Sequence, residues 1–171
     1  MNHLLWSTVA VARLVPDASR VSRMEEKKPI RSFRDLEVYQ TAYQAMLDVF
    51  THVLPTLPPE EKYDLTDQLR RSAKAVPRLI AEGHSKRHQR RGFQKYLDDA
   101  MTESNETGVS LSQAKDLYPF LVPVEMCERL MDVYDKISRQ CYNLALAWDK
   151  FSERRPGTQP NDDRRNEPRN R

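Results

Sequence analysis

The chain of 171 residues has only four glycines and two cysteines, and no apolar run approaches the roughly 20 residues that a membrane-spanning helix requires. We therefore expect no membrane association. Few glycines, combined with abundant Leu, Ala, Glu, Lys, Arg and Gln, favour helices over strands. At this length, a hydrophobic content of 39% predicts one compact domain of the all-α class.

The cysteines are too few and too far apart for a disulfide framework. Cys127 and Cys141 fall in one expected helix, which separates them by roughly 21 Å at about 1.5 Å per residue. A disulfide requires Cα atoms within about 7 Å of each other, so these two cannot pair. Because both lie on an apolar stripe, we expect buried free thiols and a cytoplasmic protein.

The chain also lacks common catalytic motifs: it has no Gly-rich phosphate loop, no Cys-x-x-Cys and no Gly-x-Ser-x-Gly. His84 and His88 have the i, i+4 spacing of a zinc-binding pair, but no third ligand follows at a defined spacing. A run of acids could form a carboxylate cluster, although a solvated helix face, or pairing with neighbouring bases, explains it more simply: Asp98, Asp99, Glu103 and Glu106. We predict no catalytic residue, no metal and no cofactor.

What the chain does contain is four apolar stripes with spacings of three and four residues, which predict four helices. The first helix, about 32–53, carries Leu36, Tyr39, Tyr43, Met46, Phe50 and Val53. Ser32 and Asp35 have the spacing of a capping box at its start. The second, about 60–82, carries Leu65, Leu69, Ala73, Val76 and Ile80. Pro77 should bend it, and Gly83 should end it.

The third helix is predicted at about 89–117 and the fourth at about 123–151. The third stripe consists of Phe93, Leu97, Ala100, Ser104, Thr107, Leu111, Ala114 and Tyr118. The fourth consists of Cys127, Leu130, Tyr134, Ile137, Cys141, Leu144, Trp148 and Phe151. Small and polar residues replace large apolar ones around 102–108, which predicts a close approach of backbones there.

Short links between these helices favour an antiparallel up-down-up-down four-helix bundle over residues 32–152. Residues 1–31 are expected to form a flexible N-terminal extension, within which Met24 is a second plausible start. A mildly apolar run at 4–12 has no base before it, which argues against a signal peptide. Residues 153–171 are polar and are expected to be a disordered tail.

The charge is unevenly distributed. The chain carries +3 in total, but residues 70–95 contain nine bases and one acid, a local charge of +8. We call these nine bases the basic patch: Arg70, Arg71, Lys74, Arg78, Lys86, Arg87, Arg90, Arg91 and Lys95. Arg70, Lys74 and Arg78 form an i, i+4, i+8 line on one flank of the second helix.

Such an excess of cations attracts polyanions, and a nucleic-acid backbone, of RNA or DNA, is the first candidate partner. Two alternatives stay open. The patch could dock an acidic protein partner or a neighbouring subunit, or it could be a solvated helix surface whose bases pair with nearby acids. No base-reading motif is present, so nucleic-acid binding would have weak sequence specificity.

Three stretches, in this order, carry a family resemblance: Phe33-Arg34-Asp35-Leu36-Glu37-Val38-Tyr39, Tyr63-Asp64-Leu65-Thr66-Asp67-Gln68-Leu69-Arg70-Arg71-Ser72-Ala73, and Val76-Pro77-Arg78-Leu79-Ile80-Ala81-Glu82-Gly83. The chain resembles the four-helix bundle family first noted in intervening sequences of ribosomal RNA genes. It is similar to the accessory variability protein of diversity-generating retroelements. The resemblance implies a homo-oligomer, a pentameric barrel, that binds nucleic acid and a reverse transcriptase. Leu79 and Thr102-Glu103 depart from the family pattern, which has Asn and Gly-Ser there.

Overall fold

The computed structural model describes residues 30–153, except for the side chains of Arg90 and residues 149–153. Four α-helices form the fold: α1 (Glu37–Asp48), α2 (Leu65–Ser85), α3 (Arg90–Leu117) and α4 (Val124–Glu153). Most of the predicted N-terminal extension, and the predicted tail beyond residue 153, lie outside the described residues. Within 30–153 there is no strand, which confirms the all-α class.

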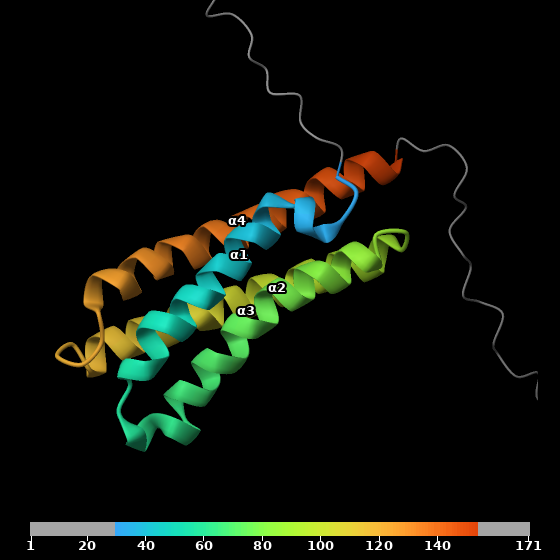
Figure 1. The fold of residues 1–171 in the computed structure, drawn as a ribbon. Coiled ribbons are helices and arrows are strands. Elements are labelled where there is room, and N and C mark those ends of the chain that lie inside the picture. Colours follow the sequence, from blue (N-terminus) through green and yellow to red (C-terminus); the bar gives the residue numbers. More distant parts are fainter. Residues whose placement is uncertain (1–29, 154–171) are drawn as a thin grey trace, which may run out of the picture.

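The helices form a bundle with short connections. Helix α3 packs against α2 and α4, and the shorter α1 lies against α2 and α4. The colours in Figure 1 show that α1 and α3 run in one direction and α2 and α4 in the other, the predicted up-down-up-down order. None of the helices within 30–153 is both long and apolar enough to cross a membrane.

The predicted apolar stripes of α2, α3 and α4 form the core. Every stripe residue of α2 is buried, as are those of α3 up to Ala114 and those of α4 up to Cys141. Cys127 and Cys141 are free and buried, as predicted. Burial raises the pKa of the Cys141 thiol to about 12, so the thiol stays protonated at neutral pH.

The predicted stripe of α1 was partly wrong. Leu36 and Val53 are buried, but Tyr43 is 46% exposed. The buried face of α1 is instead made of smaller residues spaced by four and three: Val38, Ala42, Ala45 and Val49. Small side chains let this short helix sit close to α2 and α4, and the larger residues of the neighbouring stripe are displaced to the edge of the interface.

The ends of the first two predicted helices also differ from the structure. Helix α1 is preceded by a 3₁₀ turn (Phe33–Asp35), and Ser32 and Asp35 form the expected capping box on that turn. Beyond Asp48 the chain continues as a π-helical turn (Val49–Val53) and a 3₁₀ turn (Leu54–Thr56). A further 3₁₀ turn (Pro59–Tyr63) occupies the predicted start of helix two, and Glu61 accepts the backbone N–H of Leu65 at 3.1 Å where α2 begins.

Gly83 does not end helix two, contrary to the prediction. It is buried inside α2, which continues to Ser85 and passes through Pro77 without a break. A Cβ at Gly83 would lie 3.1 Å from Tyr96 Cβ and 3.7 Å from a ring carbon of Phe93. The glycine therefore provides room for α3 to approach, which is a different role from helix termination.

The predicted close approach near the middle of α3 is supported by buried hydroxyls. Ser104, Thr107 and Ser110 are all buried. The Ser104 hydroxyl donates to the Tyr134 carbonyl of α4 at 2.7 Å. The Thr107 oxygen lies 2.9 Å from the Ser72 hydroxyl of α2 and 2.8 Å from the Glu103 carbonyl oxygen. Specific hydrogen bonds thus replace large apolar contacts in this layer.

Candidate nucleic-acid interface

Helix α2 presents three of the predicted cations along its exposed side. Arg70, Lys74 and Arg78 are exposed, because they alternate with the buried stripe that faces α1 and α3. Lys74 lies with its ammonium 5.9 Å from the centre of the Phe50 ring, a cation–π contact that leaves the charge uncompensated. Among the residues that the structure describes, no carboxylate pairs with these three cations.

The turn between α2 and α3 adds further charge. Lys86 and Arg87 are exposed there, as is Arg91 at the start of α3, and none has an ion-pair partner among the described side chains. Arg87 donates to the His84 carbonyl at 2.9 Å, and its own carbonyl accepts the Trp148 indole N–H at 3.1 Å. These bonds tie the turn to α4. The Arg90 side chain lies outside the described residues.

Two members of the basic patch are partly neutralised, as the solvated-surface alternative anticipated. Arg71 pairs with Asp67 at 3.2 Å, and Lys95 pairs with Asp99 at 3.1 Å. Both are exposed pairs between residues four apart on one helix, which contribute little stability and exchange readily for other anions. Of the nine predicted bases, six are exposed and form no ion pair with a described carboxylate, two form weak pairs, and the side chain of Arg90 lies outside the described residues.

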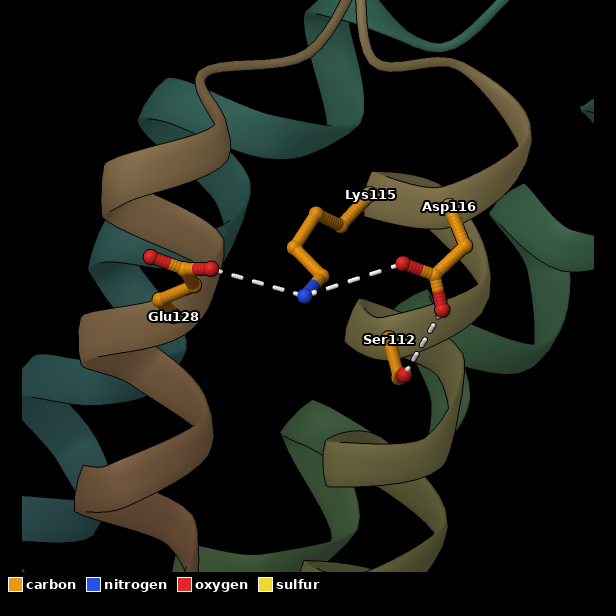
Figure 2. A network of polar contacts seen from close by, with 4 residues as sticks. All are labelled: Ser112, Lys115, Asp116 and Glu128. Carbon is orange, nitrogen blue, oxygen red and sulfur yellow. Dashed lines mark hydrogen bonds and ion pairs between the residues drawn. The ribbon is translucent and has the colours of Figure 1, made fainter.

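A contrasting lysine shows what a structural cation looks like in this fold. Lys115 of α3 lies 3.4 Å from Glu128 of α4 and 3.6 Å from Asp116, and its side chain is 25% exposed. Figure 2 shows the ammonium group between the two carboxylates, with Ser112 bonded to Asp116 at 3.3 Å. Lys115 therefore links α3 to α4, and the two carboxylates neutralise its charge. Arg70, Lys74 and Arg78 of α2 have no such ion pairs among the described residues.

A groove of about 810 Å³ lies beside the exposed flank of α2. Three bases of the basic patch, Arg71, Lys74 and Arg78, contribute to its lining. Its other sides come from the start of the chain's described part, from α1 and from α3. The volume falls in the range of about 300–1,000 Å³ that small-molecule sites occupy.

Three aromatic side chains line the groove, and we call them the aromatic wall: Phe33, Tyr39 and Tyr43. The rings of Phe33 and Tyr39 meet edge to face with centroids 4.8 Å apart. Tyr39 and Tyr43 stack with centroids 5.9 Å apart and an interplanar angle of 26°. The wall is thus an ordered stack that ends in the half-exposed ring of Tyr43.

Two carboxylates of α3, Glu103 and Glu106, line the groove as well. Burial and the nearby Glu106 raise the pKa of Glu103, while Arg78 and Arg71 oppose this shift. From the sequence, these acids were expected on a solvated face or paired with neighbouring bases. Glu106 is exposed, and both acids join aromatic and cationic groups in one concave surface.

The histidine pair offers no metal site in this structure. His84 is buried at the end of α2, and burial together with Arg87 lowers its pKa. His88 lies in the exposed turn that follows. Within the described part of the chain, no three His, Cys, Asp or Glu residues come together in a way that could hold a metal ion.

The aromatic wall is the part of the site that the sequence did not reveal. Tyr39 and Tyr43 belonged to the predicted core stripe of helix one, and Phe33 was noted only for the family resemblance. The spacing of the two tyrosines is typical of core residues. They lie outside the core because α1 packs through its smaller residues instead. The sequence does contain a signal: a second stripe with regularly spaced alanines lies beside the aromatic one. Two adjacent stripes could have indicated that the smaller residues face the core and that the aromatic residues lie at the surface.

The described residues form an all-α bundle of four helices with an aromatic, cationic groove beside α2. Residues 34–143 match the family described as 23S rRNA-intervening sequence protein, and the chain belongs to this family. The match confirms the resemblance seen in the sequence. A search of curated proteins found no match.

Proposed function

We propose that this protein is a non-enzymatic RNA-binding bundle that contacts the phosphate backbone. The observation that carries the proposal is a row of exposed cations on α2, in the following turn and at the start of α3, which form no ion pair among the described residues: Arg70, Lys74, Arg78, Lys86, Arg87 and Arg91. From Arg70 to Lys86 this row extends about 24 Å along the helix, long enough to meet several phosphates. Membership of a family named for ribosomal RNA favours RNA over DNA.

A phosphate interface has a measurable signature, because each contact releases counterions. We expect the affinity for a structured RNA to fall steeply with salt. Replacing Arg70 or Arg78 by Gln should weaken binding of all sequences alike and reduce the salt slope by about 1 for each phosphate that is no longer neutralised. The measurement is a fluorescence anisotropy titration between about 50 and 200 mM salt.

Arg129→Gln is the matched control, because it removes the same charge from an exposed position on α4. It should leave affinity and slope unchanged. An affinity that is insensitive to salt, or an equal loss in the control and the α2 variants, contradicts the phosphate mechanism.

A second candidate is assembly, with the basic patch docking an acidic partner or another copy of the chain. Tyr142 and Leu146 favour it: they are 53% and 42% exposed and lie one turn apart on α4. The homo-oligomer, its pentameric form and an association with a reverse transcriptase are proposals from the family resemblance. Sedimentation of an Arg87→Glu variant tests the role of the patch in assembly: dissociation of an oligomer with unchanged RNA affinity favours this candidate over the first.

A further inference from the structure

The groove beside α2 combines three kinds of group that a phosphate backbone alone does not need. The aromatic wall offers π-faces, Arg71, Lys74 and Arg78 supply positive charge, and Glu103 and Glu106 supply negative charge. Carboxylates inside the groove repel phosphates. A ligand that fits must therefore carry its anionic part along the cations and place a neutral, planar, hydrogen-bonding part between the acids and the aromatic wall.

An unpaired nucleotide has this distribution of groups. Single-stranded RNA is recognised by bases that stack on aromatic side chains and bond through their Watson–Crick edges, while Arg and Lys follow the backbone. The stack of Phe33, Tyr39 and Tyr43 ends in an accessible ring, which can extend by one more planar group. A duplex keeps its bases paired and cannot use such a wall.

The acids limit which base fits. An ionised carboxylate only accepts hydrogen bonds and does so through two oxygens. Guanine is the base whose Watson–Crick edge presents two neighbouring donors, N1–H and the N2 amino group. Uracil presents one donor between two carbonyl acceptors, which a carboxylate repels. The half-buried position of Glu103 strengthens this discrimination, because water competes less there.

We propose that the groove between α1, α2 and α3 binds an unpaired guanine of single-stranded RNA, with the base stacked on Tyr43 and its donor edge on Glu103. This inference rests on the proposed RNA-binding function and adds a base-specific subsite to it. The flanking phosphates lie against Lys74 and Arg78, so the groove and the basic patch act on one strand.

The test compares RNAs that differ in one base, using the full-length protein. A uridine 12-mer with one central guanine should bind about ten-fold more tightly than the all-uridine 12-mer, as one good bidentate contact provides. Inosine, which lacks the N2 amino group, should recover only part of this gain. Tyr43→Ala should lower affinity for the guanine 12-mer about ten-fold, while Tyr43→Phe keeps it, since stacking requires the ring and not the hydroxyl.

Two further variants separate the subsite from general effects. Glu103→Gln should remove the preference for guanine over uridine while leaving the affinity for uridine unchanged or higher. Tyr63→Ala, in the 3₁₀ turn before α2, is the control for loss of an exposed tyrosine and should change nothing. A duplex without unpaired guanine should bind the tyrosine variants as tightly as it binds the parent protein, and Glu103→Gln at least as tightly.

The outcomes distinguish the two proposals. If no RNA binds with salt-dependent affinity, the proposed function fails and the subsite fails with it. If duplex and single strands bind but guanine confers no advantage, or Tyr43→Ala weakens the duplex and the single strand equally, the guanine subsite alone is overturned. It is also overturned if Tyr43→Ala changes the sedimentation of the free protein, because the wall would then be a contact between subunits.

Discussion

The indole N–H of Trp148 in α4 donates a hydrogen bond to the carbonyl of Arg87, 61 residues earlier in the chain, at 3.1 Å. The Trp148 ring also packs against Phe93 of α3, with ring centroids 4.9 Å apart. One side chain thus holds the turn that carries Lys86 and Arg87 against two helices. The cations of this turn are presented from a fixed backbone.

Replacing Trp148 by Phe tests this role. Ring packing against Phe93 is largely kept while the hydrogen bond is lost, so the free energy of unfolding should fall by about 1 kcal/mol. Amide hydrogen exchange should accelerate at residues 86–89 and stay unchanged at residues 54–64, at the other end of α2. Equal acceleration at both ends would indicate general destabilisation.

The hydroxyls of Ser72 and Thr107 form a buried pair that a double-mutant cycle can measure. The Thr107 hydroxyl has one proton for two neighbours, the Ser72 oxygen and the Glu103 carbonyl, so the Ser72 hydroxyl must supply the proton for the other bond. Thr107→Val should cost about 1–3 kcal/mol, because it leaves the Ser72 hydroxyl buried and unpaired.

The double variant Ser72→Ala with Thr107→Val should cost less than the sum of the two single variants. Thr102→Val is the control, since the exposed Thr102 hydroxyl bonds only to the Asp98 carbonyl one turn earlier, at 3.1 Å. It should cost less than about 0.5 kcal/mol. Strict additivity of the pair in chemical denaturation would contradict a direct interaction.

Two glycines in helices allow a matched comparison. A methyl group at Gly108 of α3 meets nothing within 4 Å, so Gly108→Ala should stabilise the protein by about 1 kcal/mol through helix propensity. Gly83→Ala gains the same propensity but brings Cβ to 3.1 Å from Tyr96 Cβ, a backbone-anchored atom that cannot swing away. We therefore expect Gly83→Ala to be destabilising. The thermal unfolding midpoint should rise in Gly108→Ala and fall in Gly83→Ala. Stabilisation by both substitutions would show that α3 can retreat from Gly83 at no cost.

The buried side chain of His84 should make the stability of the protein depend on pH. Burial, reinforced by Arg87 and opposed by Asp35, lowers the pKa of His84 from its ordinary value of 6.5. The unfolded chain then takes up a proton at higher pH than the folded chain does. The stability that neutral His84 contributes is complete above pH 6.5 and is lost as the pH falls through the lower pKa of the folded state.

Thermal unfolding midpoints between about pH 5 and 7.5 should therefore drop toward the acid side in the parent protein. The drop should be smaller in His84→Gln, which has no titrating ring. His88→Gln, in the exposed turn, should retain the full drop. A parent curve that is flat across this window would contradict the burial of His84.

Much of the fold could be predicted because helical periodicity reports burial. The stripes of α2, α3 and α4 were confirmed almost residue by residue. Periodicity failed for α1, where two adjacent stripes compete, and the alanine-containing one is buried because it lets α1 pack closely against α2 and α4. Gly83 was misassigned for a related reason: the same residue type ends a helix or admits a neighbour, and only the position of Tyr96 decides between the two.

The site was predicted less completely than the fold. The charge count identified the cations of α2 and the turn, but it could not tell that Arg71 and Lys95 pair with Asp67 and Asp99. The i, i+4 spacing of those pairs is visible in the sequence, but many acids and bases with the same spacing form no ion pair. The aromatic wall and the acids of α3 come from distant segments, and their meeting depends on how the helices pack.

The buried hydroxyls of α3 have a consequence for the bundle as a whole. Apolar contacts alone fix the register of two helices only weakly, since one apolar surface packs against another at several offsets. A shift of α3 by one turn, about 5.4 Å, would separate Ser104 from the Tyr134 carbonyl and Thr107 from Ser72. These polar groups would then be buried without these hydrogen bonds, which is unfavourable. These bonds fix the register of α3 against α2 and α4, and with it the position of the α3 acids beside the cations of α2.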